Sequence, residues 1–128
     1  MINESEPPAV AIFGIPFHDL TLAETLQDID RMIERRHAGY IVTPNLDFAA
    51  QAAADPDLHR ILLGAHRILC DGMPLVWSSR WLGTPLKERV AGSDLTPILA
   101  EHAARKGYRV YFLGSTLEVL EQAKKTGL

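Results

Sequence analysis

The chain has 128 residues and a formal net charge of −3, from 16 acidic and 13 basic side chains. This length fits one globular domain, and the charge balance excludes a broad cationic surface for nucleic acid. Apolar residues make up 47% and charged residues 23% of the chain, which excludes intrinsic disorder. The single cysteine, Cys70, excludes an internal disulfide and a multi-cysteine zinc site, and it suits a reducing compartment such as the cytoplasm.

The predicted elements alternate between strands and helices from the N-terminus to the C-terminus. Residues 1–8 are predicted to be a frayed polar tail, and residues 9–128 a single α/β domain. Strands are predicted at residues 10–13, 40–43, 67–70 and 109–113. Helices are predicted to begin near residues 21, 46, 55, 73, 93 and 116. This order predicts a Rossmann-like fold with a mainly parallel sheet and flanking helices.

The last predicted helix is not followed by another strand. A helix in such a fold normally crosses over to a further parallel strand, and none follows Leu128. We therefore expect the sheet to be truncated at the C-terminus. Its open edge predicts self-association, because bare strand edges recruit other strands.

Three predicted strand ends carry candidate site residues: Thr43 with Asn45, Asp71 with Gly72, and Gly114. Ligand sites of parallel sheets gather at the carboxyl ends of the strands. Asp71 directly follows an apolar strand, where a carboxylate can accept a substrate proton, although the same place suits a helix cap. Thr43 and Asn45 can donate hydrogen bonds to a ligand or form a turn or cap. Gly114 precedes a helix N-terminus that suits a phosphate, with a plain strand–helix turn as the alternative.

The charged residues outside the strand ends favour an anion contact over a metal site. Arg89 lies in a predicted loop, where its guanidinium can bind phosphate or simply be solvated. Two acid pairs imitate the DxD metal motif. Asp28 and Asp30 lie two apart in a helix and do not face each other, whereas Asp55 and Asp57 satisfy a helix N-terminus. Because the histidines are also scattered, we expect no metal ion and no cofactor.

Two kinds of side chain are expected to serve packing. Cys70 lies in an apolar strand, where a thiol fills space and is not a nucleophile. Trp77 and Trp81 lie four residues apart on one predicted helix face. That spacing favours a core or interface role over a platform for a sugar.

Four segments follow one another in a specific order and spacing: Ile-Val-Thr-Pro-Asn (41–45), Asp-Pro-Asp-Leu (55–58), Cys-Asp-Gly-Met-Pro-Leu-Val-Trp (70–77) and Glu-Arg-Val-Ala-Gly-Ser-Asp-Leu (88–95). Tyr-Phe-Leu-Gly (111–114) continues the pattern. With these segments the chain resembles, from about Ile12 onward, the N-terminal portion of the WecG/TagA/CpsF family of bacterial glycosyltransferases, glycosyltransferase family 26.

The resemblance implies an inverting glycosyltransferase of cell-surface polysaccharide synthesis, such as teichoic acid or exopolysaccharide. The enzyme would move an N-acetylmannosamine-type or related sugar from a UDP-sugar to an undecaprenyl-diphosphate-linked acceptor. The resemblance places the catalytic base on Asp71, a second catalytic residue on Thr43 and substrate binding on Asn45, Gly72 and Arg89. Asp71 would take the proton of the attacking hydroxyl, and Arg89 would stabilise charge on the leaving diphosphate.

Our own addition to that mechanism is the loop at Gly114, whose helix N-terminal N–H groups would bind the diphosphate as well. Family members are longer and carry later α/β units with a glutamine-containing site segment and a C-terminal region for membrane contact. We expect a cytoplasmic protein that is at most peripheral to the inner face of the cell membrane.

Two alternatives remain at this point. One is a non-catalytic α/β fragment that binds a partner or a nucleotide. The other is a small nucleotide-dependent enzyme of a different type, which the absence of GxGxxG and P-loop motifs disfavours.

Overall fold

A computed structural model describes residues 6–125 and divides the chain into two compact units, Met1–Ala91 and Gly92–Leu128. The predicted tail lies outside the described residues up to position 5, and residues 6–8 form no regular element. The described chain contains six helices and two small sheets, so its class is mixed α/β, as predicted.

The chain begins with a β-hairpin. Strands β1 (Ala9–Ile12) and β2 (Ile15–His18) pair antiparallel, with Ile12 opposite Ile15. The two residues between them, Phe13 and Gly14, both have positive φ angles of 53° and 71°. Such a turn reverses the chain with the twist that a two-residue hairpin needs. The strand predicted at residues 10–13 is present as β1, shifted by one residue, whereas the second strand of the hairpin, β2, was not predicted from the sequence.

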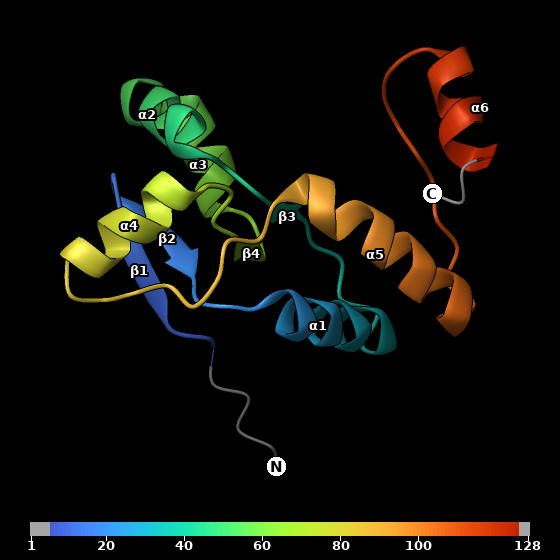
Figure 1. The fold of residues 1–128 in the computed structure, drawn as a ribbon, viewed down its shortest axis with the longest axis horizontal. Helices are drawn as coiled ribbons and strands as arrows, with labels where there is room; N and C mark the ends of the chain where they lie inside the picture. Colours follow the sequence, from blue (N-terminus) through green and yellow to red (C-terminus); the bar gives the residue numbers. More distant parts are fainter. Residues whose placement is uncertain (1–5, 126–128) are drawn as a thin grey trace. The chain divides into compact units, whose positions relative to one another are not determined.

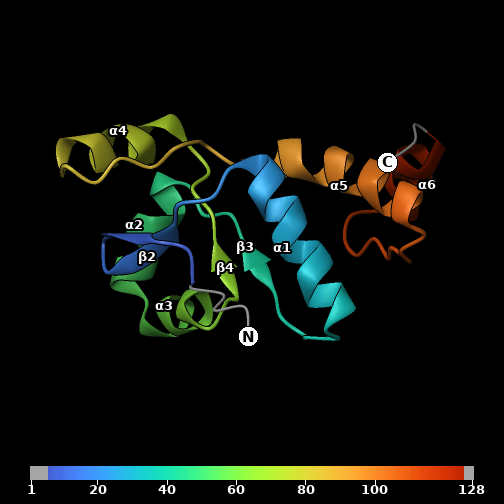
Figure 2. The same ribbon diagram turned by 90° about the horizontal axis from the view of Figure 1, so that it is seen from below.

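The parallel pairing that the sequence predicts is present between β3 (Ile41–Val42) and β4 (Arg67–Ile68). Each of these strands has only two residues, so the expected mainly parallel sheet is represented by this pair alone in the described chain. In both ribbon views the pair lies between α1 on one side and α2 with α3 on the other (Figures 1 and 2).

Four helices of the first unit begin where the sequence predicts, because their caps are local. They are α1 (Leu22–Glu34), α2 (Leu46–Ala54), α3 (Pro56–Leu63) and α4 (Met73–Trp81). Thr21 and Glu24 form a reciprocal capping box at the start of α1. Asn45 caps α2, and Asp55 caps α3 with Pro56 in the first turn.

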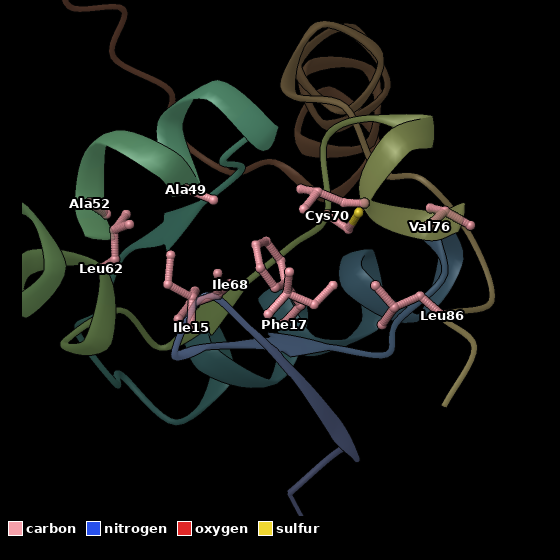
Figure 3. Close-up of a cluster of buried hydrophobic side chains, with 11 residues drawn as sticks. Ile15, Phe17, Ala49, Ala52, Leu62, Ile68, Cys70, Val76 and Leu86 are labelled. Atoms are coloured by element: carbon pink, nitrogen blue, oxygen red, sulfur yellow. The ribbon is translucent and has the colours of Figure 1, made fainter. Parts of the chain in front are cut away.

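The main cluster of buried hydrophobic side chains lies within the first unit. Ile15, Phe17 and Ile68 occupy the middle of the cluster, and Figure 3 shows other core side chains on either side of them. The cluster also contains Ile12, Ala49, Ala52, Leu62, Cys70, Leu75, Val76 and Leu86. The hairpin, β4 and helices α2 to α4 are thus held together by one apolar core.

A buried charge cluster attaches α1 to the start of β4. Asp28 is 4% exposed, and its Oδ2 lies 2.7 Å from Nε of Arg67, while Nη2 of Arg67 donates to Oδ1 at 3.3 Å. Nε2 of His66 lies 3.5 Å from the same carboxylate. Because a buried carboxylate is costly without cations, this cluster fixes the position of α1 against the parallel pair.

The second unit contains α5 (Gly92–Lys106) and α6 (Leu117–Lys125). The prediction of a strand at residues 109–113 was wrong, since this segment has no regular structure. Tyr111 and Leu113 are 87% and 90% exposed. A strand needs a neighbour for its backbone groups, and none pairs with this segment in the described chain. Among the described helices, none has the length and apolar character needed to cross a bilayer.

Candidate active site

Backbone hydrogen bonds bring two of the predicted strand ends together. The pairing of β3 with β4 continues beyond the strands: Leu69 donates to the carbonyl of Val42 at 2.9 Å, and Asp71 donates to the carbonyl of Pro44 at 3.2 Å. The segment from Thr43 to Asn45 therefore runs beside Asp71. This is the juxtaposition expected at the carboxyl edge of a parallel pair.

The Asp71 side chain is half-buried and is not used as a helix cap. Helix α4 has Gly72 as its N-cap, with no side-chain capping bond. Among the described residues, no hydrogen bond or ion pair of the Asp71 carboxylate is found. The capping alternative is thus contradicted, and the carboxylate is left available for chemistry.

Gly72 makes the sharp turn between β4 and α4. Its φ and ψ angles are 145° and 138°, a conformation that side chains strongly disfavour. A Cβ there would meet Pro74 at an ordinary 3.7 Å, so the requirement for glycine comes from the backbone and not from space. Gly72 therefore turns the chain from the end of β4 into α4, directly after Asp71.

An open pocket of about 490 Å³ lies at this edge. Its lining residues come from the end of β3, the first turns of α2 and the start of α4: Asn45, Leu46, Asp47, Ala50, Asp71, Gly72 and Pro74. Asp47 was not selected from the sequence, because an acid in the first turn of a helix is ordinary capping chemistry. The only sequence signal for it was its place two residues after Asn45. The pocket therefore contains two carboxylates and no cationic lining residue.

Asn45 lines the pocket, whereas Thr43 does not. The Oδ1 of Asn45 accepts from the N–H of Phe48 at 2.8 Å, so the capping role predicted as an alternative is present. Capping uses only the oxygen, and the amide N–H₂ of Asn45 remains chemically able to donate. Thr43 is half-buried beside Pro44 and is not among the residues that line the pocket.

Arg89 lies near the same strand end through its neighbour. Val90 donates its N–H to the carbonyl of Cys70 at 2.8 Å, which places the segment around Arg89 beside the end of β4. Hydrogen bonds join the loop before it to α1 and the segment just before that helix. Lys87 N–H donates to Oδ1 of Asp19 at 2.7 Å, the Lys87 ammonium pairs with Glu24 at 3.3 Å, and Oε2 of Glu88 accepts from the N–H of Leu22 at 3.3 Å. The arginine is exposed.

Cys70 is packed in the core, as predicted. It is 2% exposed, and burial, together with the neighbouring Asp71 carboxylate, raises the pKa of its thiol to about 11. The thiol is therefore protonated near neutral pH and is a poor nucleophile.

The acids of the DxD-like pairs have other partners. Asp28 pairs with Arg67, and Asp55 caps α3 through the N–H groups of Asp57 and Leu58. In the described part of the chain, no group of three or more metal-ligating side chains gathers.

Gly114 belongs to the second unit, and the binding of phosphate by the N–H groups that follow it remains a prediction. It has a φ of 130° and is followed by Ser115 at 58°. The hydroxyl of Thr116 accepts from the N–H of Val119 at 3.4 Å, so the start of α6 already has one cap of its own.

Comparison with known proteins identifies sequences that are similar to this chain. The family model described as the glycosyl transferase WecG/TagA/CpsF family matches residues 10–126. A Bacillus spizizenii protein named N-acetylglucosaminyldiphosphoundecaprenol N-acetyl-beta-D-mannosaminyltransferase is 33% identical over 90 residues, which cover 70% of this chain and 35% of that protein. A Staphylococcus aureus protein of the same name is 27% identical over 124 residues, or 95% of this chain and 49% of that protein. The chain thus spans at most about half the length of these curated relatives.

Proposed function

Since the chain belongs to the WecG/TagA/CpsF family of glycosyl transferases, we propose that it carries the catalytic-base portion of an inverting glycosyltransferase site. The observation that carries the proposal is the Asp71 carboxylate. It stands half-buried at the end of a parallel strand and lines a pocket, while the helix that follows does not use it as a cap.

The proposed reaction transfers an N-acetylmannosamine-type sugar from a UDP-sugar to an undecaprenyl-diphosphate-linked acceptor. Support for these substrates comes from the two relatives, whose names give an N-acetylmannosaminyl group and N-acetylglucosaminyldiphosphoundecaprenol. The product would be a lipid-linked disaccharide for a cell-envelope polymer such as teichoic acid or exopolysaccharide.

In the proposed mechanism Asp71 accepts the proton of the attacking acceptor hydroxyl. The hydroxyl oxygen forms the new bond to the anomeric carbon as the bond from that carbon to the UDP oxygen breaks, which inverts the configuration. A positioned base of this kind contributes roughly 10²- to 10⁴-fold to the rate. Thr43 and the amide of Asn45 are assigned to orienting the sugar beside the base.

The charge of the pocket decides which part of the substrates it suits. Asp47 and Asp71 line it, and no Arg or Lys does, so it favours hydroxyl-rich sugar groups and repels a diphosphate. We therefore assign the sugar to the pocket and the diphosphate to cations at its edge. Arg89 is the proposed partner, since a guanidinium fork matches phosphate oxygens, and the N–H groups near Gly114 are a second candidate.

The same proposal includes the sheet type, the oligomeric state and the location of the protein. The β3–β4 pair would be part of a mainly parallel, Rossmann-like sheet, and its uncovered edge would support a homo-oligomer. The protein would act at the cytoplasmic face of the cell membrane, with peripheral contact only. A strictly monomeric mass in light scattering at high protein concentration would contradict the oligomer.

UDP release by the purified 128-residue chain tests the proposed function. The assay supplies UDP-N-acetylmannosamine with and without a short-chain GlcNAc-diphosphate lipid, and circular dichroism confirms folding. We expect acceptor-dependent release that falls at least 100-fold in Asp71→Asn. Asp57→Asn is the matched control, because this acid is 81% exposed and lies outside the pocket. A folded chain without release would favour the non-catalytic alternative, and equal loss in both variants would contradict the role of Asp71 as the base.

A further inference from the structure

Helix α4 has a fixed inner face. Leu75 and Ser79 are fully buried and Val76 is 2% exposed. The hydroxyl of Ser79 donates to the carbonyl of Val76 and accepts from the N–H of Leu86 at 2.9 Å, so the buried polar group is satisfied. Because these three residues hold the helix against the core, its opposite face is directed outward.

That outward face is apolar to an unusual degree. Trp77 is 58% exposed, Trp81 is 97% exposed and Leu82 is 62% exposed. We call this surface the tryptophan face and define it by its residues: Met73, Pro74, Trp77, Arg80, Trp81 and Leu82. A groove of about 390 Å³ runs along it between Pro74 and Leu82. The interface role predicted for the two tryptophans agrees with this exposure, whereas a core role does not.

The charge on the tryptophan face is positive. Arg80, which lies between Trp77 and Trp81 in the sequence, is exposed, and within the described residues no acid pairs with its guanidinium. From Gly72 to Lys87 the sequence contains no Asp or Glu. Exposed indoles with a nearby arginine and no acid are the composition of a surface that lies at the headgroup level of a bilayer.

The tryptophan face is continuous with the candidate active site. Pro74 lines both the groove and the pocket that contains Asp71. At 1.5 Å rise per residue, the stretch from Pro74 to Trp81 measures about 10 Å. A contact made by the tryptophans therefore fixes how far Asp71 stands from whatever surface they touch.

We propose that the tryptophan face rests on an anionic lipid bilayer, with Trp77 and Trp81 at the headgroup level and Arg80 bound to lipid phosphate. This assignment rests on the peripheral membrane contact of the proposed function and names the surface that makes it. A bilayer fits better than a second copy, since a two-fold contact through this face would bring the same arginine from both chains into an apolar interface. In this orientation the Asp71 pocket opens beside the bilayer surface.

The two tryptophans are the only ones in the chain, so tryptophan fluorescence reports on this face alone. The 128-residue chain is titrated at low concentration with phosphatidylglycerol vesicles and, separately, with phosphatidylcholine vesicles. We expect a blue shift of the emission with phosphatidylglycerol that is at least tenfold weaker in Arg80→Glu. Co-sedimentation should fall similarly in the double variant Trp77→Ser/Trp81→Ser. Tyr111→Ser, an exposed aromatic change in the second unit, should bind as the parent chain does.

Other outcomes overturn the proposal. A blue shift that grows with protein concentration in the absence of vesicles would assign the face to a second copy. No shift of the emission with either kind of vesicle would contradict any contact of this face with a bilayer. UDP release measured with a short-chain acceptor in detergent-free buffer does not depend on vesicles, so loss of lipid binding with retained release separates this proposal from the proposed function.

Discussion

The His18 side chain accepts a hydrogen bond from the backbone N–H of Ile68. Its Nδ1 accepts the N–H of Ile68 at 2.9 Å, and the bond joins β2 to β4. A histidine can accept there only while Nδ1 carries no proton. Burial, and after it the nearby Arg67 guanidinium, lower the pKa of His18 below its ordinary value of 6.5. The folded chain therefore favours the neutral imidazole at this position.

Because of His18, the free energy of unfolding is expected to decrease as the pH is lowered. Below about pH 6.5, a histidine with a lowered pKa binds fewer protons in the folded than in the unfolded chain. Its contribution to the free energy of unfolding is therefore complete above that pH and is lost as the pH decreases below it. His66 acts in the same direction, with its pKa lowered by burial and by Arg67. Urea unfolding at pH 7.5 and pH 5.5 measures the loss.

A variant separates His18 from the other acid-sensitive groups. In His18→Asn the amide oxygen stands near the position of Nδ1 and accepts the same N–H at every pH. We expect a smaller difference in unfolding free energy between the two pH values, with the part due to His66 retained. An unchanged difference would show that the bond to Ile68 does not control the pH response.

At this scale the sequence identifies residues whose role follows from a strand end. Asp71 and Asn45 were selected because each follows an apolar strand, and the structure places both at one pocket. Asp47 and His18 were not selected, since the first resembles an ordinary helix acid and the partner of the second lies 50 residues away. Chemistry that depends on a distant partner leaves no local pattern.

Among the elements, α1 depends on charge for its attachment. The buried residues of this helix are Thr25 and Asp28, while the apolar Ile33 is 43% exposed. Replacing Asp28 with Leu leaves the Arg67 guanidinium, 11% exposed, without its closest anion. We expect a loss of about 3–5 kcal/mol in the free energy of unfolding, the usual cost of breaking a buried pair from one side.

The double variant Asp28→Leu/Arg67→Met tests this reason for the loss. Removing both charges should restore much of the stability that the single change removes, because no unpaired ion is left in the interior. Urea unfolding of the four chains gives the coupling energy. Asp57→Ala, which breaks an exposed pair with Arg60, should change stability little. Additive losses in the double variant would contradict a coupled ion pair.

Helices were predictable in this chain and strands were less so, for a physical reason. Three helix starts are marked by a capping side chain that accepts from an N–H group two or three residues away: Thr21, Asn45 and Asp55. A strand is stable only beside another strand, and the sequence does not say which segments meet. The same apolar composition thus predicted a strand correctly at β3 and incorrectly at residues 109–113.

On the scale of the whole molecule, the two units differ in how much they bury. All core cluster residues lie between Ile12 and Leu86, whereas α6 has no buried residue and α5 has only Leu95 and Ala103. Backbone hydrogen bonds open most readily where little apolar surface covers them. The protection of amides against exchange should therefore change sharply along the chain.

Hydrogen exchange followed by mass spectrometry measures this difference directly. Peptides that cover β2 and the stretch from β4 to α4 should remain protected for the longest times, while peptides from residues 109–125 should exchange early. Strong protection of residues 109–113 would show that this segment pairs as a strand in solution, as its composition first predicted.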